Sequence, residues 1–161
     1  MKITHVAHSN CLLGEGPVWM AERGELVFVD IIGRKLMAWS PQGGLRKADT
    51  KLMVGSFARL KDGRLLAAAG RGLYLLDPLT GALTSLGRDE LIGPDNLMND
   101  GKCDRSGAFV FGSKDVNEKE PSGCLMHFSG AQVRQWNPGI VLNGPAFSPD
   151  GARIYFADSP T

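Results

Sequence analysis

The sequence predicts an all-β protein, and three observations support that fold class. Glycine makes up 21 of the 161 residues, well above a usual share of about 7%, and glycine favours tight turns over helix interiors. No segment keeps the apolar spacing of an amphipathic helix. A short motif of two polar residues, a glycine and an apolar run also recurs along the chain. Such recurrence of short strands is typical of a β-propeller.

The recurring motif defines the predicted strands. Its glycines lie 39, 44 and 44 residues apart, at Gly24, Gly63, Gly107 and Gly151. The segments that contain them, each ending in an apolar strand, are residues 22–30, 61–69, 105–112 and 149–158. A second apolar strand follows in the first three units, at residues 35–39, 72–77 and 123–128. A period near 44 residues with about four strands per unit has the size of a propeller blade.

The predicted domain is a partial β-propeller over residues 1–161. Its blades are expected near residues 12–54, 55–98 and 99–142, and the next blade begins in residues 143–161. This amounts to about three and a half blades, whereas propellers usually close with roughly four to eight. Open blade edges present unpaired backbone groups, so we expect the chain to self-associate through them.

Two segments between the predicted strands are expected to be loops. Residues 90–98 contain Gly-Pro-Asp-Asn, which favours a loop over a helical turn. Residues 114–122 are polar and interrupt the third unit between its two strands. We interpret them as a surface excursion, and the alternative is a lid over the mouth of the propeller channel.

Composition excludes several classes of protein. The chain carries 18 Lys and Arg against 17 Asp and Glu, so it has no basic field for nucleic acid or an anionic membrane. The hydrophobic share of 43% excludes a disordered chain, and no apolar run approaches the roughly 20 residues of a membrane span. Three cysteines without metal-ligand spacing, and no signal segment after Met1, fit a cytoplasmic protein.

Polar residues recur at one phase just upstream of the repeat glycines. Asn99 and Asn143 each precede their glycine by 8 residues, Glu15 precedes its glycine by 9, and Gly55 occupies this phase in the second unit. Equivalent positions of successive blades lie on one ring around the channel. Three oxygen-bearing side chains on such a ring would suit Ca²⁺ or Mg²⁺. The alternative is that both asparagines only form turns.

The environment of Glu15 also favours a cation. Its carboxylate stands beside Gly-Pro in an otherwise apolar stretch, and a buried carboxylate without a partner is costly. His5, His8 and His127 offer no comparable set of ligands, and we expect structural roles for them. The sequence has no Gly-x-Ser-x-Gly nucleophile motif and no phosphate-binding glycine loop.

Four motifs together resemble the gluconolactonase and regucalcin (senescence marker protein 30) family. They are GEGPVW at residues 14–19, FVDI at 28–31, NDGKCD at 99–104, and NGPAFSPDG at 143–151 followed by YFAD at 155–158. The resemblance runs through the whole chain in order and corresponds to the N-terminal half of the family fold. It implies a six-bladed β-propeller that binds one divalent cation in its channel and hydrolyses a sugar lactone.

The resemblance also implies roles for individual residues. Glu15 and Asn143 would be metal ligands, and Asn99 would contact the substrate. The cation would be Ca²⁺, Zn²⁺, Mn²⁺ or Mg²⁺, and it would polarise the lactone carbonyl while a carboxylate takes a proton from the attacking water. The family's base is an aspartate of a later blade, beyond residue 161, so no catalytic residue is expected in this chain. The alternative function is a non-catalytic propeller fragment or binding module that associates with a partner or with itself.

Overall fold

A computed structural model describes residues 2–159, without the side chains of residues 137 and 138. The described residues form fourteen strands in four antiparallel sheets and contain no helix, which confirms the all-β prediction. The first sheet contains β1 (Gly14–Met20), β2 (Glu25–Asp30), β3 (Lys35–Ser40) and β4 (Gly44–Asp49). The second contains β5 (Val54–Arg59), β6 (Leu65–Ala69), β7 (Gly72–Leu76) and β8 (Leu83–Arg88). The third contains β9 (Asn96–Cys103), β10 (Phe109–Asp115), β11 (Gly123–Phe128) and β12 (Val133–Gly139), and the fourth contains β13 (Leu142–Phe147) and β14 (Ile154–Asp158).

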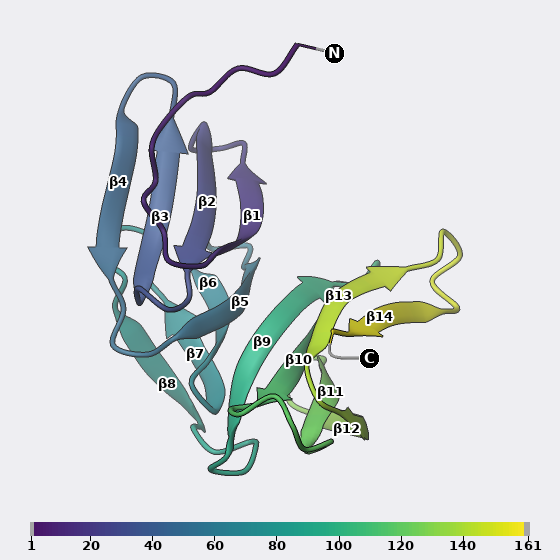
Figure 1. Cartoon of the computed structure of the whole chain (residues 1–161). Helices are drawn as coiled ribbons and strands as arrows, with labels where there is room; N and C mark the ends of the chain where they lie inside the picture. The colour runs from purple at the N-terminus through teal and green to yellow at the C-terminus, as the bar shows by residue number, and fades with distance from the viewer. Residues whose placement is uncertain (1, 160–161) are drawn as a thin grey trace.

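The four sheets are arranged as blades of a partial propeller. In each sheet the strands follow one another in chain order, and every neighbouring pair is antiparallel. The first strands of successive sheets, β1, β5, β9 and β13, contact one another. Figure 1 shows them on the inner side of the fan, with β4, β8 and β12 on the outside. The described chain therefore forms three complete blades and two strands of a fourth.

Apolar side chains fill the layers between neighbouring blades. The first layer is built around Met20, Val29, Leu36, Phe57 and Leu65. The second is built around Leu73, Met98, Phe109, Phe111 and Met126. The third is thinner and contains Val110, Leu125 and Leu142, with Phe147 packed against them. It is thin because the fourth blade contributes only two strands.

Asp30 and Asp158 perform the same structural task in the first and fourth blades. Asp30, at the end of β2, accepts hydrogen bonds from the backbone amides of Leu12 (3.1 Å) and Leu13 (3.0 Å). Asp158, at the end of β14, accepts them from Ile140 and Val141 (2.7 Å to the latter). Each aspartate thus ties the chain that enters the inner strand to the neighbouring strand of the same blade.

The two predicted loops are present. Residues 90–95 form bends and turns, and β9 begins at Asn96. Residues 116–122 are exposed, as a surface excursion requires, whereas the preceding residues 114 and 115 still belong to β10. Because the described residues contain no helix, none of them could cross a membrane as a helical span. The last two residues of the predicted fourth unit lie outside the described residues.

Candidate metal and substrate site

The predicted ring residues lie along one hollow on the inner side of the blades. The hollow has a volume of about 200 Å³ and is lined by residues of the first, second, third and fourth sheets and of the loops beside them. Its lining includes all four positions of the predicted ring: Glu15, Gly55, Asn99 and Asn143. Residues about 130 positions apart in sequence, Glu15 and Asn143, therefore share one site.

A β-bulge interrupts each inner strand at the level of this hollow. In β1 the pairing shifts between Glu15 and Val18, and in β13 it shifts between Asn143 and Ala146. The strand pairing is also irregular in the second blade, at Gly55 of β5, and in the third blade, where β9 lies opposite Gly112 of β10. Bulges bend a strand and redirect its side chains, and they are common beside functional sites.

The structure refines the positions of the three polar ring residues along their strands. Glu15 pairs with Val29, and Asn143 pairs with Ala157, so both side chains precede their bulges. In the third blade the regular pairing of β9 with β10 stops at Met98, which pairs with Ser113. Asn99 is the next residue of β9 and therefore lies inside the bulge. Asn99 is therefore displaced by one residue along its strand relative to the other two, although all three line the hollow.

The burial argument for Glu15 is wrong. Glu15 is exposed, and the apolar residues before it are exposed as well, Leu12 by 71% and Leu13 by 39%. The desolvation cost of a buried carboxylate therefore gives no reason to expect a cation. The position of Glu15 in the hollow, beside two asparagine side chains, is the observation that remains.

Close packing of backbones explains why the second blade has a glycine at this level. A Cβ atom on Gly55 would lie 2.5 Å from the carbonyl oxygen of Met98 and 2.7 Å from that of Asn99. No side chain fits between β5 and β9 here. The second blade therefore contributes backbone, and not a ligand side chain, to the hollow.

Hydrogen bonds between neighbouring inner strands hold the polar residues in place. The Oγ of Ser56 donates to the carbonyl oxygen of Asn99 (2.8 Å), and Nδ2 of Asn99 donates to the carbonyl oxygen of Leu142 (2.9 Å). The carboxylate of Asp100 accepts hydrogen bonds from the amides of Gly101 (2.8 Å) and Gly144 (2.9 Å). With Nδ2 of Asn99 occupied, its Oδ1 is the atom that can serve a ligand.

The donor set suits a hard divalent cation. Glu15 offers carboxylate oxygens, and the two asparagines offer amide oxygens, which are the ligand types that Ca²⁺ and Mg²⁺ prefer. Among the described residues no three His, Cys, Asp or Glu side chains are grouped as a metal cluster. Any cation held here would therefore depend on amide oxygens as well as on Glu15.

The hollow contains residues that sequence reasoning had not assigned to the site. Lys114, Glu118, Asp100 and Ser159 also line it. Lys114 and Glu118 belong to the polar segment for which a lid was the alternative interpretation. Their contribution to the hollow shows that the segment reaches the site, which its composition alone did not decide.

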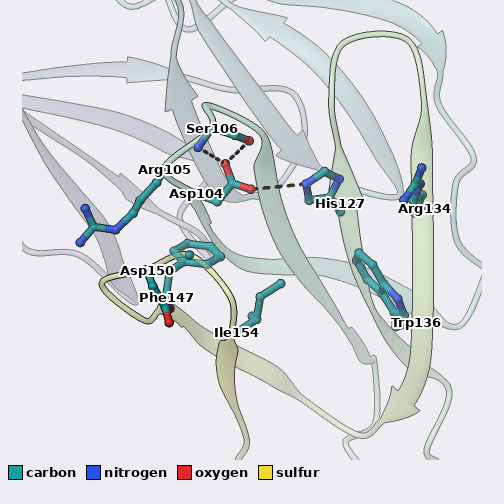
Figure 2. Close-up of a pocket in the computed structure, with 10 residues that line it drawn as sticks. Asp104, Arg105, Ser106, His127, Arg134, Trp136, Phe147, Asp150 and Ile154 are labelled. Atoms are coloured by element: carbon teal, nitrogen blue, oxygen red, sulfur yellow. Dashed lines mark hydrogen bonds and ion pairs between the residues drawn. The ribbon is translucent and has the colours of Figure 1, made fainter.

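A second and larger hollow, of about 560 Å³, lies between the third and fourth blades. Figure 2 shows Asp104 and His127 on one side of it, Arg134 and Trp136 on β12, and Phe147 and Ile154 on the last two strands. It contains none of the four ring positions. It lies at the thin third layer, where the two strands of the fourth blade cover only part of β11 and β12, so its size reflects incomplete packing.

His127 lines this second hollow. Its Nε2 lies 3.4 Å from a carboxylate oxygen of Asp104, and its ring contacts the edge of Trp136 with centroids 6.0 Å apart. Burial raises the pKa of Asp104, but hydrogen bonds from Ser106, Ala108 and His127 lower it by a larger amount. The net effect is a lowered pKa, so the carboxylate stays ionised at neutral pH. The pair joins the turn after β9 to β11.

Comparison with known proteins shows the family to which the chain belongs. Residues 13–161 match the family model described as SMP-30/Gluconolactonase/LRE-like region. The chain belongs to this family. It is 34% identical to L-arabinolactonase of Azospirillum brasilense over 97% of the chain and 54% of that protein. It is 29% identical to regucalcin of Xenopus laevis over 99% of the chain and 56% of that protein.

A solved structure of the family has the same fold. Regucalcin from Agrobacterium tumefaciens, described as a calcium-binding protein, superposes with a TM-score of 0.82 at 30% identity, over 93% of this chain and 52% of that one. The chain thus spans about half the length of the relatives it matches. The predicted membership of the family, as an incomplete gluconolactonase-type propeller, is confirmed.

Proposed function

We propose that this chain carries part of the site of a sugar-lactone hydrolase that depends on a divalent cation. The single observation that supports this most is the convergence of Glu15, Asn99 and Asn143 from three blades on one hollow. Membership of a family that includes an L-arabinolactonase adds the class of substrate. The name of the regucalcin relative, a calcium-binding protein, adds the class of cofactor.

Glu15 and Asn143 would hold the cation in this proposal. They face the hollow from the first and fourth blades, and each is positioned by a Gly-Pro bulge. A bound cation would supply Lewis-acid polarisation of the lactone carbonyl. Asn99 would orient the substrate, because its Nδ2 is engaged with Leu142 and its Oδ1 can accept from a sugar hydroxyl.

We assign no general base to this chain. Asp100 is the carboxylate nearest in sequence to Asn99, but both of its oxygens accept hydrogen bonds from backbone amides. These hydrogen bonds join neighbouring inner strands, so we assign Asp100 a structural role. The proton of the attacking water would have to go to a group outside the residues assigned here.

Calorimetric titration of the chain with Ca²⁺, Zn²⁺, Mn²⁺ and Mg²⁺ tests the metal part of the proposal. We expect one site, with Glu15→Gln and Asn143→Ala each weakening it at least about tenfold, since even residues that only support a ligand typically cost 10–100-fold. Glu90→Gln is the matched control, because Glu90 pairs with Arg71 outside the hollow. Equal affinities for the wild type and Glu15→Gln would refute the assignment.

A test of the catalytic part of the proposal requires a polypeptide that supplies the remaining blades. In such a protein Glu15→Gln should abolish metal binding and lactone hydrolysis together. Unchanged turnover with lost metal binding would exclude the cation from the reaction.

We also propose that the open blade edge takes a second copy of this chain. Among the described strands β14 pairs only with β13, and its Tyr155 and Phe156 are 54% and 49% exposed. Trp136, on β12 of the third blade, is 45% exposed. Tyr155 and Phe156 are consecutive in β14 and so lie on opposite faces of the strand. An exposed apolar edge is a template for pairing.

A further inference from the structure

Lys114 places a positive charge at the candidate site. It is the cationic side chain among the described residues that line the hollow, where Glu15, Asp100 and Glu118 are acidic. Its backbone is fixed in β10 opposite Leu97 and forms a bridge to Val141 in the next blade. The ammonium group donates to Oε1 of Glu118 at 2.6 Å, and the Lys114 side chain is 26% exposed.

The partner of Lys114 belongs to a loop that Asp115 organises. The carboxylate of Asp115 accepts hydrogen bonds from the amides of Asn117 (3.1 Å) and Lys119 (3.0 Å). Glu118 lies between these two residues and has a φ of 56°, a left-handed conformation that non-glycine residues seldom adopt. The loop thus holds the Glu118 carboxylate near Lys114.

The Glu118 carboxylate occupies the position where an anionic ligand group would bind. Its side chain is 53% exposed, and an exposed ion pair contributes little to stability. An anion of the ligand could therefore replace Glu118 on Lys114 without loss of a buried contact. A divalent cation held by Glu15 and Asn143 would offset the negative charge of the hollow, where three carboxylates accompany Lys114, and so would lessen the repulsion of an anionic ligand.

We infer that Lys114 is a specificity-determining residue that selects sugar lactones with an anionic substituent, such as a carboxylate, sulfonate or phosphate. This inference rests on the proposed function, because it assumes that the hollow binds a sugar ring. Lys114 recognises the substituent and takes no part in the proton transfers. Glu118 is the internal competitor that the substituent displaces.

Calorimetry on the chain with Ca²⁺ present tests this with two stable ring analogues, 1,5-anhydro-D-glucitol and its 6-phosphate. We expect the phosphate to bind about tenfold more tightly than the neutral ring, which corresponds to roughly 1.4 kcal/mol. Lys114→Met should remove this preference, so that the two analogues bind with similar affinities, whereas Lys114→Arg should keep it. Glu118→Gln should strengthen phosphate binding about two- to threefold, because the competing carboxylate is neutralised.

The control and the alternative outcomes separate this inference from the proposed function. Lys119→Met changes a lysine of the same loop that does not line the hollow, so it should leave both affinities unchanged. Binding of the neutral ring without any phosphate preference, or a preference that survives Lys114→Met, would overturn the inference alone. Absence of binding by both analogues would contradict the proposed function and the inference with it.

Discussion

Glu15 and Asn143 stand at the same point of two inner strands, each directly before a Gly-Pro pair that forms a β-bulge. The glycines of the two pairs, Gly16 and Gly144, have the same φ of 59°. The first and fourth blades thus use one backbone device to turn a side chain toward the hollow. This equivalence is stronger support for a shared role than the identity of either residue.

The bulge requires glycine for its backbone conformation. No atom lies within 4 Å of a Cβ placed on Gly144, so Gly144→Ala introduces strain without a clash. We expect it to lower the free energy of unfolding by about 1–2 kcal/mol, the cost of a left-handed residue, as measured by urea denaturation. Gly93→Ala, at a loop glycine without positive φ, should change it by less than about 0.5 kcal/mol. Equal effects of the two variants would contradict the role of the bulge.

Gly55 is constrained by contact and not by its backbone angles. Because its Cβ would overlap the backbone of Met98 and Asn99, Gly55→Ala must push β9 away from β5. We expect destabilisation of about 1–3 kcal/mol, typical of an overpacked core. Urea denaturation measures the loss, and calorimetry should show weaker Ca²⁺ binding, since the second and third blades separate at the hollow. An unchanged free energy of unfolding would contradict the close contact between β5 and β9 at Gly55.

Asp30 should make stability depend on pH in the acid range. Burial raises its pKa, but hydrogen bonds from the amides of Leu13, Gly33 and Leu12 lower it more, so the folded pKa lies below the ordinary value. The stabilisation is therefore complete above the unfolded pKa of about 3.9 and is lost as the pH falls through the folded pKa. Asp30→Asn should cost about 1.5–3 kcal/mol at pH 6.

Urea denaturation across the acid range checks the direction of this pH dependence. The difference between wild type and Asp30→Asn should shrink as the pH falls through the folded pKa of Asp30, because the aspartate of the wild type then becomes protonated. Asp49→Asn is the control, because the side chain of Asp49 is 85% exposed and pairs with Lys35 at the surface. A difference that is independent of pH would mean that the charge of Asp30 is not what the amides bind.

A cation bound to the folded chain should raise its thermal stability. At a free concentration 100 times the dissociation constant, one site adds about 2.7 kcal/mol. The Tm measured with added CaCl₂ should therefore exceed that in EDTA, and Glu15→Gln should remove the difference. A calcium-induced rise that survives Glu15→Gln would locate the ion elsewhere in the chain.

Self-association through β14 should be visible by sedimentation. We expect the wild-type chain to sediment as a dimer or larger species at micromolar concentration. Phe156→Lys should shift it toward the monomer, because a charge on an edge strand opposes pairing. Leu79→Lys, at a loop residue that is also exposed by 56%, should have no effect. A stable wild-type monomer would contradict the proposal.

Much of the fold could be predicted from local sequence patterns. The polar pair, glycine and apolar run mark the second strand of every blade, as β2, β6, β10 and β14 show. Turn residues and strand periodicity act over a few positions, so they leave a direct trace in the sequence. Even the ring of Glu15, Asn99 and Asn143 followed from spacing, because a propeller repeats one geometry in each blade.

No local sequence pattern predicts the contacts between blades, which depend on tertiary packing. The exposure of Glu15 and the backbone contact at Gly55 depend on how β1, β5, β9 and β13 meet. The place of Asn99 inside its bulge depends on how β9 pairs with β10. The same is true of Lys114, whose charge reaches the hollow only because β10 and the next loop bring it there. Repetition along the chain encodes the blade, whereas the chemistry of the hollow depends on residues from different blades, whose approach only the assembled blades specify.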